Sequence, residues 1–548
     1  MTFSLGKDQD KVEARLRAWA EAGFLRRLRA KDPTLWAAGP ASEVKNRLGW
    51  LDLPETIEPR LAGIEAFAGE VVAEGFTHAV LLGMGGSSLA PEVFERTFGH
   101  APRHPGLLVL DSTHPEAVAA VERRLDFGRT LFLVSSKSGT TVEPLSFFRY
   151  FWSRSGRVAP SPGRRFIAIT DPGTPLAALA RKRGFRRVFE AAPDVGGRFS
   201  ALTEFGLVPA VLIGVDVRKL LASAREEARA DAAGAPERLS SALRLGAVLG
   251  EVAAARNKLT FLVSPSLRSF PDWIEQLVAE STGKAGKGII PVVGEPALPA
   301  GRYGADRLFV SFVVGSDPHR DVDQLAASLE LAGHPVVRIQ IEDRYSLGAE
   351  IYRWETAVAA AGAVLSVNPF DQPDVELAKE LARQAMARES GGGTKAAAAE
   401  TTVAADDAPA LSAALDGWLA RTRSGDYLAL QAYLAPGEAV DKALRSLRQA
   451  LLARTGLPTT MGYGPRFLHS TGQLHKGGPN EACLLQLVDQ PAADLDIPET
   501  DLTFGNLIRA QALGDYQALL QRGRRILRVD VGRDAAAGLT RLAALAAS

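Results

Sequence analysis

Five hydroxyl side chains and a lysine lie within seven consecutive positions of this sequence, Ser135–Thr141. They follow Leu131–Val134, an apolar run of strand length, and precede an apolar-rich segment with helical periodicity. A helix N-terminus offers unpaired N–H groups and partial positive charge, hydroxyl groups donate hydrogen bonds, and Lys137 adds a full charge. Ser and Thr also cap ordinary helices, but five hydroxyl groups exceed what one cap needs. The stretch therefore predicts a phosphate-binding site.

A second turn of similar type, Gly83–Ser88, follows an upstream apolar run. Gly85 and Gly86 allow the backbone to approach a ligand closely, and Ser87 lies where the next helix begins. Dinucleotide-binding domains also carry a glycine-rich turn here, but the spacing G-x-G-G-S-S differs from theirs. Because ligands bind at the carboxyl ends of parallel strands, we expect both turns to converge on one phosphate.

Two further stretches carry groups suited to moving a proton beside a carbonyl. In Val195–Gly206, two glycines can bring Arg198 close to developing oxyanion charge, the alternative being a surface turn with a solvated arginine. In Pro271–Lys284, Glu280 belongs to the apolar face of a helix and lies near its C-terminus. Desolvation and the negative helix end should raise the pKa of this carboxyl, as a general base requires. A simple pairing of Glu280 with Lys284 is the alternative.

The stretch Phe370–Lys379 is compatible with two interpretations. Gln372 and Lys379 lie about two helical turns apart on one side, so both could face a ligand. Glu376 and Lys379 are also spaced as an ordinary i,i+3 ion pair. The residues alone do not decide between these interpretations.

The loop Gly464–Asn480 carries two histidines, His469 and His475, among glycines and hydroxyl residues. Histidine titrates near neutrality, so such a loop could handle the protons of a ligand. Neither histidine has the neighbours of a metal site, and the chain lacks an H-E-x-x-H motif. We therefore expect no zinc site.

Length and composition bound the class of protein. The 548 residues are too many for one hydrophobic core, and 46% apolar with 23% charged residues is typical of a soluble globular protein. The 64 Lys and Arg against 63 Asp and Glu give no overall field for nucleic acid or a membrane surface. A single cysteine, Cys483, excludes an intramolecular disulfide and suits a reducing cytosol. With neither a signal core nor a long apolar run, we expect a cytoplasmic protein.

Short apolar runs alternate with amphipathic stretches of helical length, which predicts parallel sheets. The runs of the first set are His78–Leu82, Leu107–Leu110, Leu131–Val134, Arg165–Ile169 and Arg187–Phe189. A second set comprises Leu259–Val263, Gly288–Val293, Leu308–Val314 and Pro335–Ile341. The last set comprises Tyr427–Tyr433, Ala482–Val488 and Ile526–Val531. The predicted fold is α/β, with two doubly wound parallel-sheet domains and a smaller C-terminal α/β unit.

The expected organisation has five parts. Residues 1–45 form a helical N-terminal segment, 46–220 a first α/β domain and 221–387 a second. Residues 388–410 are rich in Gly, Ala and Thr with nothing large to bury, which is typical of a linker. Residues 411–548 form the C-terminal α/β unit.

The loops Gly83–Ser88 and Ser135–Thr141, in this order along the chain, resemble those of the sugar-isomerase domains of phosphosugar proteins. Val195–Gly206 looks like the glycine-glycine-arginine signature of the glucose-6-phosphate isomerase family. Glu280–Lys284 is similar to the family's Glu-Ser-Asn-Gly-Lys segment, with Thr282 in place of Asn. Phe370–Lys379 matches a second family signature, from which it departs at Pro373, Asp374 and Ala378.

The segment around His475, with Lys476 and Gly477, resembles more loosely the family's Gln-Leu-x-His-x-Gly segment, which carries the ring-opening histidine. In the common family arrangement this segment precedes the Phe-Asp-Gln signature, whereas here it follows the predicted linker. The C-terminal unit is therefore rearranged, and is similar to the isomerase part of transaldolase–isomerase fusion proteins.

The resemblance implies an aldose–ketose isomerase of glycolysis and gluconeogenesis that interconverts glucose 6-phosphate and fructose 6-phosphate, without metal or cofactor. Glu280 would move the proton, Arg198 would stabilise the cis-enediolate, and His475 with Lys379 would open the ring. The residues expected to bind the substrate are Gly85, Gly86, Ser87, Ser136, Lys137, Ser138, Thr141 and Gln372.

The expected partner is a small phosphosugar, with no nucleic acid and no membrane, and a homodimer is left open. Two alternatives remain at this stage. One is a dual isomerase of glucose and mannose phosphates, and the other is a phosphosugar-sensing protein without catalysis. The positions of Glu280 and Arg198 argue against the sensor.

Overall fold

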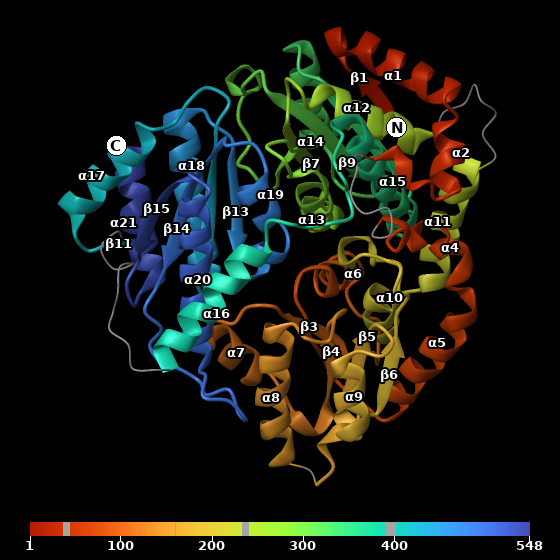
Figure 1. The fold of residues 1–548 in the computed structure, drawn as a ribbon, viewed down its shortest axis with the longest axis vertical. Helices are drawn as coiled ribbons and strands as arrows, with labels where there is room; N and C mark the ends of the chain where they lie inside the picture. The colour runs from red at the N-terminus through yellow and green to blue at the C-terminus, as the bar shows by residue number, and fades with distance from the viewer. Residues whose placement is uncertain (37–43, 159, 233–239, 391–401) are drawn as a thin grey trace.

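Three five-stranded sheets organise the protein, and helices cover their faces (Figure 1). The computed structural model describes residues 1–36, 44–158, 160–232, 240–390 and 402–548. Among the described helices, none is both long and apolar enough to cross a membrane. The predicted α/β class is confirmed, and the C-terminal unit carries a sheet of five strands like the other two.

The first sheet is entirely parallel, with the strand order β3-β2-β4-β5-β6. Its strands are β2 (His78–Leu82), β3 (Gly106–Leu110), β4 (Thr130–Ser135), β5 (Phe166–Thr170) and β6 (Arg187–Glu190). Its helices are α5 (Glu58–Ala73), α6 (Leu89–Phe98), α7 (Pro115–Glu122), α8 (Val142–Gly156), α9 (Pro175–Lys182) and α10 (Glu204–Leu212). Strand β4 is buried at every position, because a central parallel strand is covered on both faces.

The chain leaves β2 towards β3 on one side and returns to β4 on the other. The strand order therefore reverses between β2 and β4, and ligands of open α/β sheets bind at such a point. The turn Gly83–Ser88 follows β2, and the hydroxyl-rich loop follows β4. Both predicted phosphate turns consequently meet at this edge.

The second sheet has the order β1-β10-β9-β7-β8. Its strands are β1 (Thr2–Ser4), β7 (Lys258–Val263), β8 (Ile290–Val292), β9 (Arg307–Val314) and β10 (Val336–Ile341). The nearby helices are α1 (Gln9–Glu21), α2 (Phe24–Arg29), α4 (Leu53–Thr56), α11 (Val217–Ala232), α12 (Ser241–Val252), α13 (Phe270–Thr282), α14 (Arg320–Leu331) and α15 (Leu347–Leu365). The antiparallel edge strand β1 lies in the segment predicted to be helical. The prediction missed this strand because three residues are too few to show strand periodicity.

The third sheet, of order β11-β15-β14-β12-β13, belongs to the C-terminal unit (residues 402–548). Its strands are β11 (Thr402–Ala404), β12 (Tyr427–Tyr433), β13 (Thr459–Tyr463), β14 (Ala482–Val488) and β15 (Arg525–Asp530). Its helices are α17 (Ala408–Leu419), α18 (Glu438–Thr455), α19 (Gly472–Gly477), α20 (Phe504–Gln521) and α21 (Ala535–Ala547). The sequence pattern did not predict β13 or β11.

The predicted linker, residues 388–410, is only partly described. Residues 391–401 lie outside the described residues, whereas β11 and the start of α17 occupy the rest of the segment beyond them. The helix α16 (Glu376–Ser390) precedes this segment and runs between the third sheet and the first (Figure 1).

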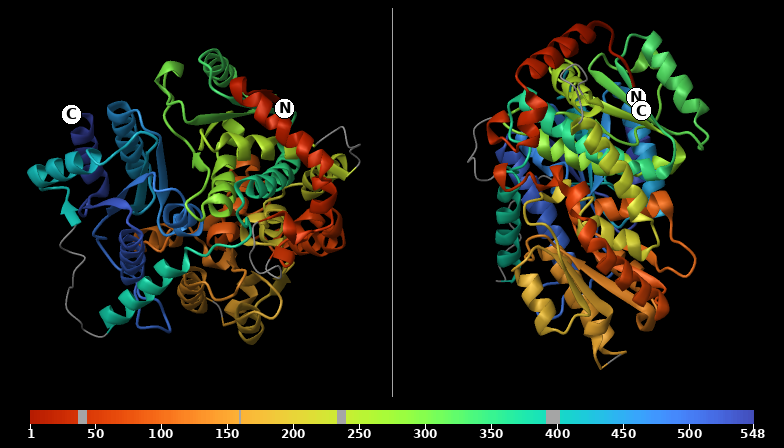
Figure 2. Two further views of the ribbon diagram at one scale, coloured as in Figure 1. Left: turned by 45° about the horizontal axis from the view of Figure 1, so that its top comes forward. Right: turned by 90° about the vertical axis from the view of Figure 1, so that its right-hand side faces the viewer.

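The C-terminal unit packs against both other sheets, and Figure 2 shows it beside them. One shared apolar cluster joins Ala279 and Val292 of the second sheet's unit to Tyr427 and Leu474 of the C-terminal unit. Against the first sheet, the rings of Phe147 and Phe504 stack at 5.9 Å between centroids. Burial of apolar surface therefore holds the third sheet next to the phosphate edge of the first.

Candidate active site

The hydroxyl-rich loop leads into α8 without capping it. Thr141 is the N-cap residue, yet its side chain accepts no hydrogen bond from the first turn of the helix. Instead, the Ser136 Oγ donates to Thr141 Oγ1 at 3.0 Å, and the hydroxyl groups of Ser138 and Thr140 lie 2.9 Å apart. These hydroxyl groups therefore organise the loop itself, and the helix N-terminus keeps N–H groups for a ligand.

A cavity of about 660 Å³ opens beside this loop. From the first sheet it is lined by Ser138, Thr140, Thr141, Val142 and Glu143. Helix α16 and the C-terminal unit provide the opposite walls, with Lys379, Arg383, Leu468, His469, Lys476 and Gln511 among the lining residues. The predicted phosphate loop thus forms part of a cavity large enough for a phosphosugar.

The turn Gly83–Ser88 is where three loops meet. A Cβ atom on Gly86 would lie 2.2 Å from the carbonyl oxygen of Gly197, and one on Gly85 would lie 2.8 Å from the Cβ of His469. The backbone of Gly85 also has φ +58°, which favours glycine. These two glycines allow the arginine turn and the histidine loop to approach, while Ser87 is buried.

Lys137 differs from its predicted role. Its ammonium group forms an ion pair with Asp171 and donates to the carbonyl of Pro193 at 3.3 Å, and it does not line the cavity. Burial lowers the pKa of Lys137, although Asp171 opposes this effect. The charge expected for the phosphate is therefore already balanced within the protein.

Arg198 and Glu280 form an ion pair. They come from two separate sequence motifs that were predicted to contribute to one site. The NH1 of Arg198 lies 3.0 Å from Glu280 Oε1, and its Nε donates to Ser281 Oγ at 2.9 Å. The NH2 of Arg198 donates to the carbonyl oxygens of Pro369 and Asp371. A buried guanidinium held on four sides keeps a fixed orientation beside the carboxylate.

The Phe-Asp-Gln stretch surrounds this ion pair. Gln372 Oε1 accepts a hydrogen bond from Arg198 NH1 at 3.2 Å, so its amide contacts the arginine rather than the phosphate loop. Lys284 pairs with Asp371 at 2.7 Å, and burial lowers the pKa of Lys284 to about 7. The alternative pairing of Glu280 with Lys284 is therefore not formed.

Lys379 forms the ion pair that its spacing from Glu376 allows, whereas Gln372 lies before the start of α16 and does not share a helix side with it. Its Nζ lies 2.8 Å from Glu376, and both side chains are about half exposed at 49% and 66%. The same lysine lines the cavity from α16. Exposed ion pairs of this kind are weak, so Lys379 can turn towards a ligand at little cost.

The environment of His475 differs from the one expected for a histidine that titrates at the ligand. It is buried in α19, and burial lowers its pKa to about 3. Its Nδ1 lies 3.2 Å from Gln431 Nε2, and its ring packs near Phe467. The expectation that His475 titrates near neutrality at the ligand is wrong, because α19 turns this residue into the core of the C-terminal unit.

His469, six residues earlier, lines the cavity instead. Its Nε2 lies 3.1 Å from Glu143 Oε1, and Gln511 Nε2 donates to the same oxygen at 2.7 Å. Burial opposes ionisation of Glu143, but the charge and hydrogen bond of His469 hold the pKa of this carboxyl below its usual value. The imidazole is therefore oriented by a buried carboxylate.

One side chain links this histidine loop to the carboxylate of Glu280. Gln276 Nε2 donates to the backbone oxygen of His469 at 2.7 Å and to Glu280 Oε2 at 3.2 Å. Arg198 and Glu280 do not line the 660 Å³ cavity, and Gln276 connects them to its histidine wall. The sequence reasoning missed Gln276 and Glu143, although Gln276 lies one helical turn before Glu280 and Glu143 follows the hydroxyl loop.

No group of three or more His, Cys, Asp or Glu side chains in the described ranges could hold a metal ion. The groups available are an arginine, carboxylates, a histidine and hydroxyls. Together they can bind an anion and transfer protons.

The fold is one that phosphosugar isomerases have. The phosphoglucose isomerase family model matches residues 64–289. The glucose-6-phosphate isomerase of Carboxydothermus hydrogenoformans is 30% identical over 408 residues, covering 63% of this chain and 86% of that protein. The enzyme of the same name from Thermus thermophilus is 30% identical over 394 residues, covering 63% and 91%. This chain belongs to the glucose-6-phosphate isomerase family.

Solved structures share this fold. A hypothetical protein of Thermus thermophilus superposes with a TM-score of 0.60 and 28% identity, covering 68% of this chain and 96% of that one. A glucose-6-phosphate isomerase of Chlamydia trachomatis shares the fold, with a TM-score of 0.59, 21% identity, and 69% and 86% covered.

Proposed function

We propose that this chain interconverts glucose 6-phosphate and fructose 6-phosphate by moving one proton through a cis-enediolate. The observation that carries the proposal is the buried Arg198–Glu280 ion pair, joined through Gln276 to the histidine at the phosphate-loop cavity. A carboxylate base needs an adjacent cation when the substrate becomes an enediolate, because negative charge then develops on the two oxygens.

The substrate phosphate would bind at the N-terminus of α8, where Ser138, Thr140 and Thr141 face the cavity. The sugar would then extend past His469 towards Glu280. Phosphate bound at a helix start gains hydrogen bonds from both backbone and hydroxyl groups. Binding at this remote group fixes the reacting carbons without taking part in their chemistry.

Ring opening would use His469 in place of His475. The C1–O5 bond breaks as the ring oxygen gains a proton and the C1 hydroxyl loses one, so a group that exchanges protons near neutrality is suited to this step. Glu143 orients the imidazole, and Lys379 lies on the facing wall of the same cavity. Glu280 would then take the C2 proton and return it to C1, with Arg198 facing the enediolate.

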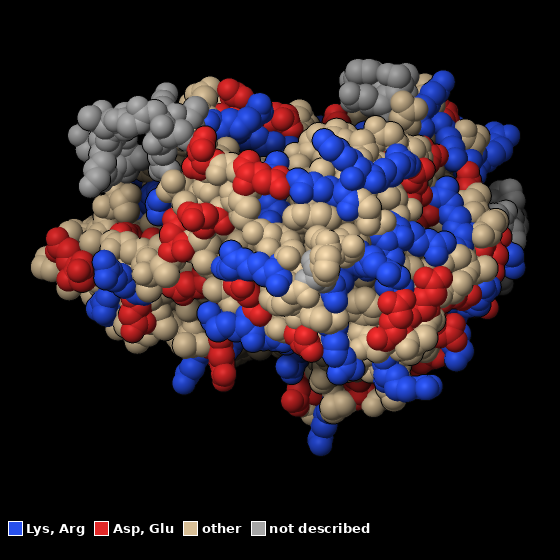
Figure 3. Space-filling view, turned by 90° about the horizontal axis from the view of Figure 1, so that it is seen from below, with Lys and Arg blue, Asp and Glu red and all other residues tan. Residues whose placement is uncertain are grey.

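The partner is a small phosphosugar, and we propose that the protein acts in the cytoplasm as an enzyme of glycolysis and gluconeogenesis. Its single cysteine, Cys483, is free and buried, which suits a reducing compartment. Basic and acidic side chains are intermixed over the face in Figure 3, in keeping with a small-molecule ligand. We further propose a homodimer of chains that each carry a complete site.

A coupled assay for fructose 6-phosphate formed from glucose 6-phosphate tests the proposal. The purified chain should form product and should incorporate solvent deuterium at C2 of glucose 6-phosphate. Binding of glucose 6-phosphate with neither product nor exchange would replace the isomerase by a phosphosugar-sensing protein. Mannose 6-phosphate assayed in parallel would reveal dual specificity.

A further inference from the structure

Arg466 lies three residues before His469 in one short helical turn. Its guanidinium contacts residues of the first sheet's unit. Its Nε lies 2.5 Å from Asp111 Oδ2, and its NH2 pairs with Glu92. Asp111 directly follows β3, and Glu92 belongs to α6. One arginine therefore joins the histidine turn to two carboxylates of another unit.

These carboxylates belong to the region around the turn Gly83–Ser88. Asp111 Oδ2 also accepts a hydrogen bond from Ser88 Oγ at 3.0 Å, and the same hydroxyl bonds the carbonyl of Gly85 at 3.1 Å. Gly85 in turn lies against His469, because a Cβ on it would be 2.8 Å from the histidine Cβ. The contacts form a closed ring that begins and ends in the histidine turn.

Holding the C-terminal unit in place does not require this ring. Arg448 independently joins that unit to the second sheet, donating to the carbonyls of Gly294 and Val293 at 3.0 Å each. Apolar packing adds to the same interface. Arg448 lies on α18, away from the cavity-lining residues, whereas Arg466 is in the turn that presents His469.

We propose, on the basis of the isomerase function above, that Arg466 is a positioning residue that fixes His469 relative to the phosphate turn. A guanidinium fork on two carboxylates defines both the distance and the orientation of the turn that carries it. Since displacement of a reacting group by about 1 Å can cost about 10²-fold in rate, ring opening depends on this contact. Proton transfer by Glu280 depends on it much less.

The test compares three substitutions in the full-length protein. Arg466→Met removes the fork, Arg466→Lys keeps one charge, and Arg96→Met is the matched control. Arg96 also pairs with Glu92, at 2.6 Å, but its side chain is 60% exposed and it contacts no part of the histidine turn. Arg448→Met serves as a second control, which weakens the interface without touching that turn.

For each folded variant, two rates are measured by nuclear magnetic resonance. Exchange between the α and β anomers of glucose 6-phosphate reports ring opening, and deuterium exchange on an open-chain substrate analogue reports proton transfer. Arg466→Met should slow anomer exchange by about 10²-fold while KM and open-chain exchange change less than about threefold. Arg466→Lys should recover part of the loss, and Arg96→Met should match the wild type.

Equal losses in both rates, or a loss no larger than that of Arg448→Met, would overturn the proposal. So would a further loss of anomer exchange when Arg466→Met is added to His469→Ala, because the arginine would then not act through the histidine. Removing Arg466 leaves two buried carboxylates, so Arg466→Met combined with Asp111→Asn is the second variant should the first fail to fold.

One readout does not need activity. The imidazole resonances of His469 should shift in Arg466→Met and stay in place in Arg96→Met, and unchanged resonances in both would contradict the positioning role. A wild-type chain that forms no fructose 6-phosphate would refute the proposed function, while these resonances would still decide whether Arg466 positions the histidine.

Discussion

The first and third sheets contribute to the same cavity in opposite ways. The first sheet supplies two loops at the point where its strand order reverses, and their hydroxyls bond mostly to one another. The third sheet supplies a loop after its edge strand β13, and this loop carries His469. Glu143 and Gln276 of other units contact His469, and Asp111 of the first sheet's unit binds Arg466 in the same loop. Under the proposed function, binding should therefore depend on local geometry, whereas proton transfer should depend on how separate units dock.

This difference predicts that substitutions on the two sides change different kinetic constants. Groups on the phosphate side should change affinity, because they contact a part of the substrate that does not react. Groups on the proton-transfer side should change turnover. The four predictions below are arranged by the size of the expected effect on catalysis.

Replacing the base should have the largest effect. Glu280→Gln keeps the shape of the side chain but removes proton acceptance, so turnover should fall by about 10²–10⁴-fold with KM nearly unchanged. Steady-state kinetics and deuterium exchange at C2 measure this. Glu275→Gln on the same helix is the matched control and should leave turnover near that of the wild type. Wild-type turnover in Glu280→Gln would exclude this carboxylate as the base.

The next largest effect should distinguish His469 from His475, because only the substitution of His469 should lower turnover. His469→Ala should lower turnover on the cyclic substrate by about 10²-fold, since the ring-opening acid/base is lost. His475→Gln should leave the pH profile of turnover between pH 6 and 9 unchanged, because burial already lowers the pKa of His475 to about 3. If His475→Gln removed an ionisation from that profile, the roles assigned to the two histidines would have to be exchanged.

The phosphate side should show a smaller effect, confined to binding. Ser138→Ala should raise KM and the inhibition constant of inorganic phosphate together, each by about tenfold, which corresponds to one hydrogen bond to a charged group. Lys137→Met should raise them less, because Asp171 already balances the ammonium group. A Lys137→Met variant that loses more affinity than Ser138→Ala would show that the lysine turns to the phosphate on binding.

The smallest effect on catalysis is expected at Glu275 of α13, where a substitution should change stability instead. Burial raises the pKa of Glu275 to about 8, above its ordinary value of 4.5. Between these two values the folded state binds more protons than the unfolded state, so stability falls as the pH rises through this window. Glu275→Gln should therefore raise the free energy of unfolding at pH 8.5, by up to about 4 kcal/mol, and by nearly nothing at pH 4. Denaturant unfolding at both values checks this, and an equal change at both would contradict it.

Strands and the loops that follow them could be predicted from the sequence because their signals are local. Apolar strands, hydroxyl loops and helix starts follow one another within a few residues, and β2 and β12 have the bounds that were predicted. That Arg198 and Glu280 belong to one site was also predicted, since both motifs resemble signatures of one family, but their ion pair was not. These features need no knowledge of how distant units pack.

The histidine loop was harder to predict, because its signals are long-range. Strand β13, which delivers the histidine loop, contains Gly462 and only five residues, so its periodicity is weak. Without that strand, the sequence offers no reason to prefer His469 over His475. The contact of Gln372 with Arg198 and that of Lys137 with Asp171 likewise depend on residues far away in the chain.

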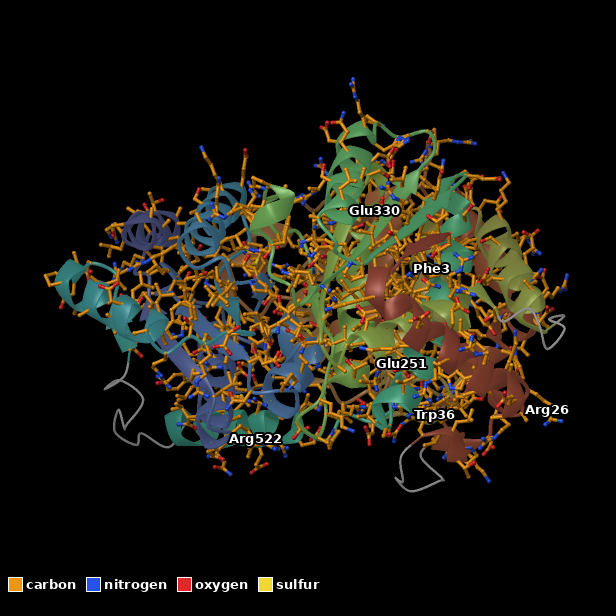
Figure 4. All side chains as sticks on the ribbon, turned by 90° about the horizontal axis from the view of Figure 1, so that it is seen from above. Phe3, Arg26, Trp36, Glu251, Glu330 and Arg522 are labelled. Carbon is orange, nitrogen blue, oxygen red and sulfur yellow. The ribbon has the colours of Figure 1, made fainter. Side chains whose placement is uncertain are left out.

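Docking of the C-terminal unit also joins segments that the sequence separates by about a hundred residues or more. Arg522, labelled in Figure 4, pairs with Asp374 at 2.6 Å and so ties α20 to the Phe-Asp-Gln stretch. Asp374 itself bonds Gln473 in the histidine segment. Position along the chain gives no sign of such a contact, because the sequence between these residues includes the predicted linker.

Mixing two inactive variants tests most directly whether one chain builds the whole site. Glu280→Gln and His469→Ala chains are purified separately, then unfolded and refolded together, and fructose 6-phosphate formation is measured. Because Gln276 joins the two groups within one chain, the mixture should show only the sum of the two residual activities. Recovery to about a quarter of wild-type activity, as random pairing of complementing subunits would give, would show that His469 comes from a neighbouring subunit.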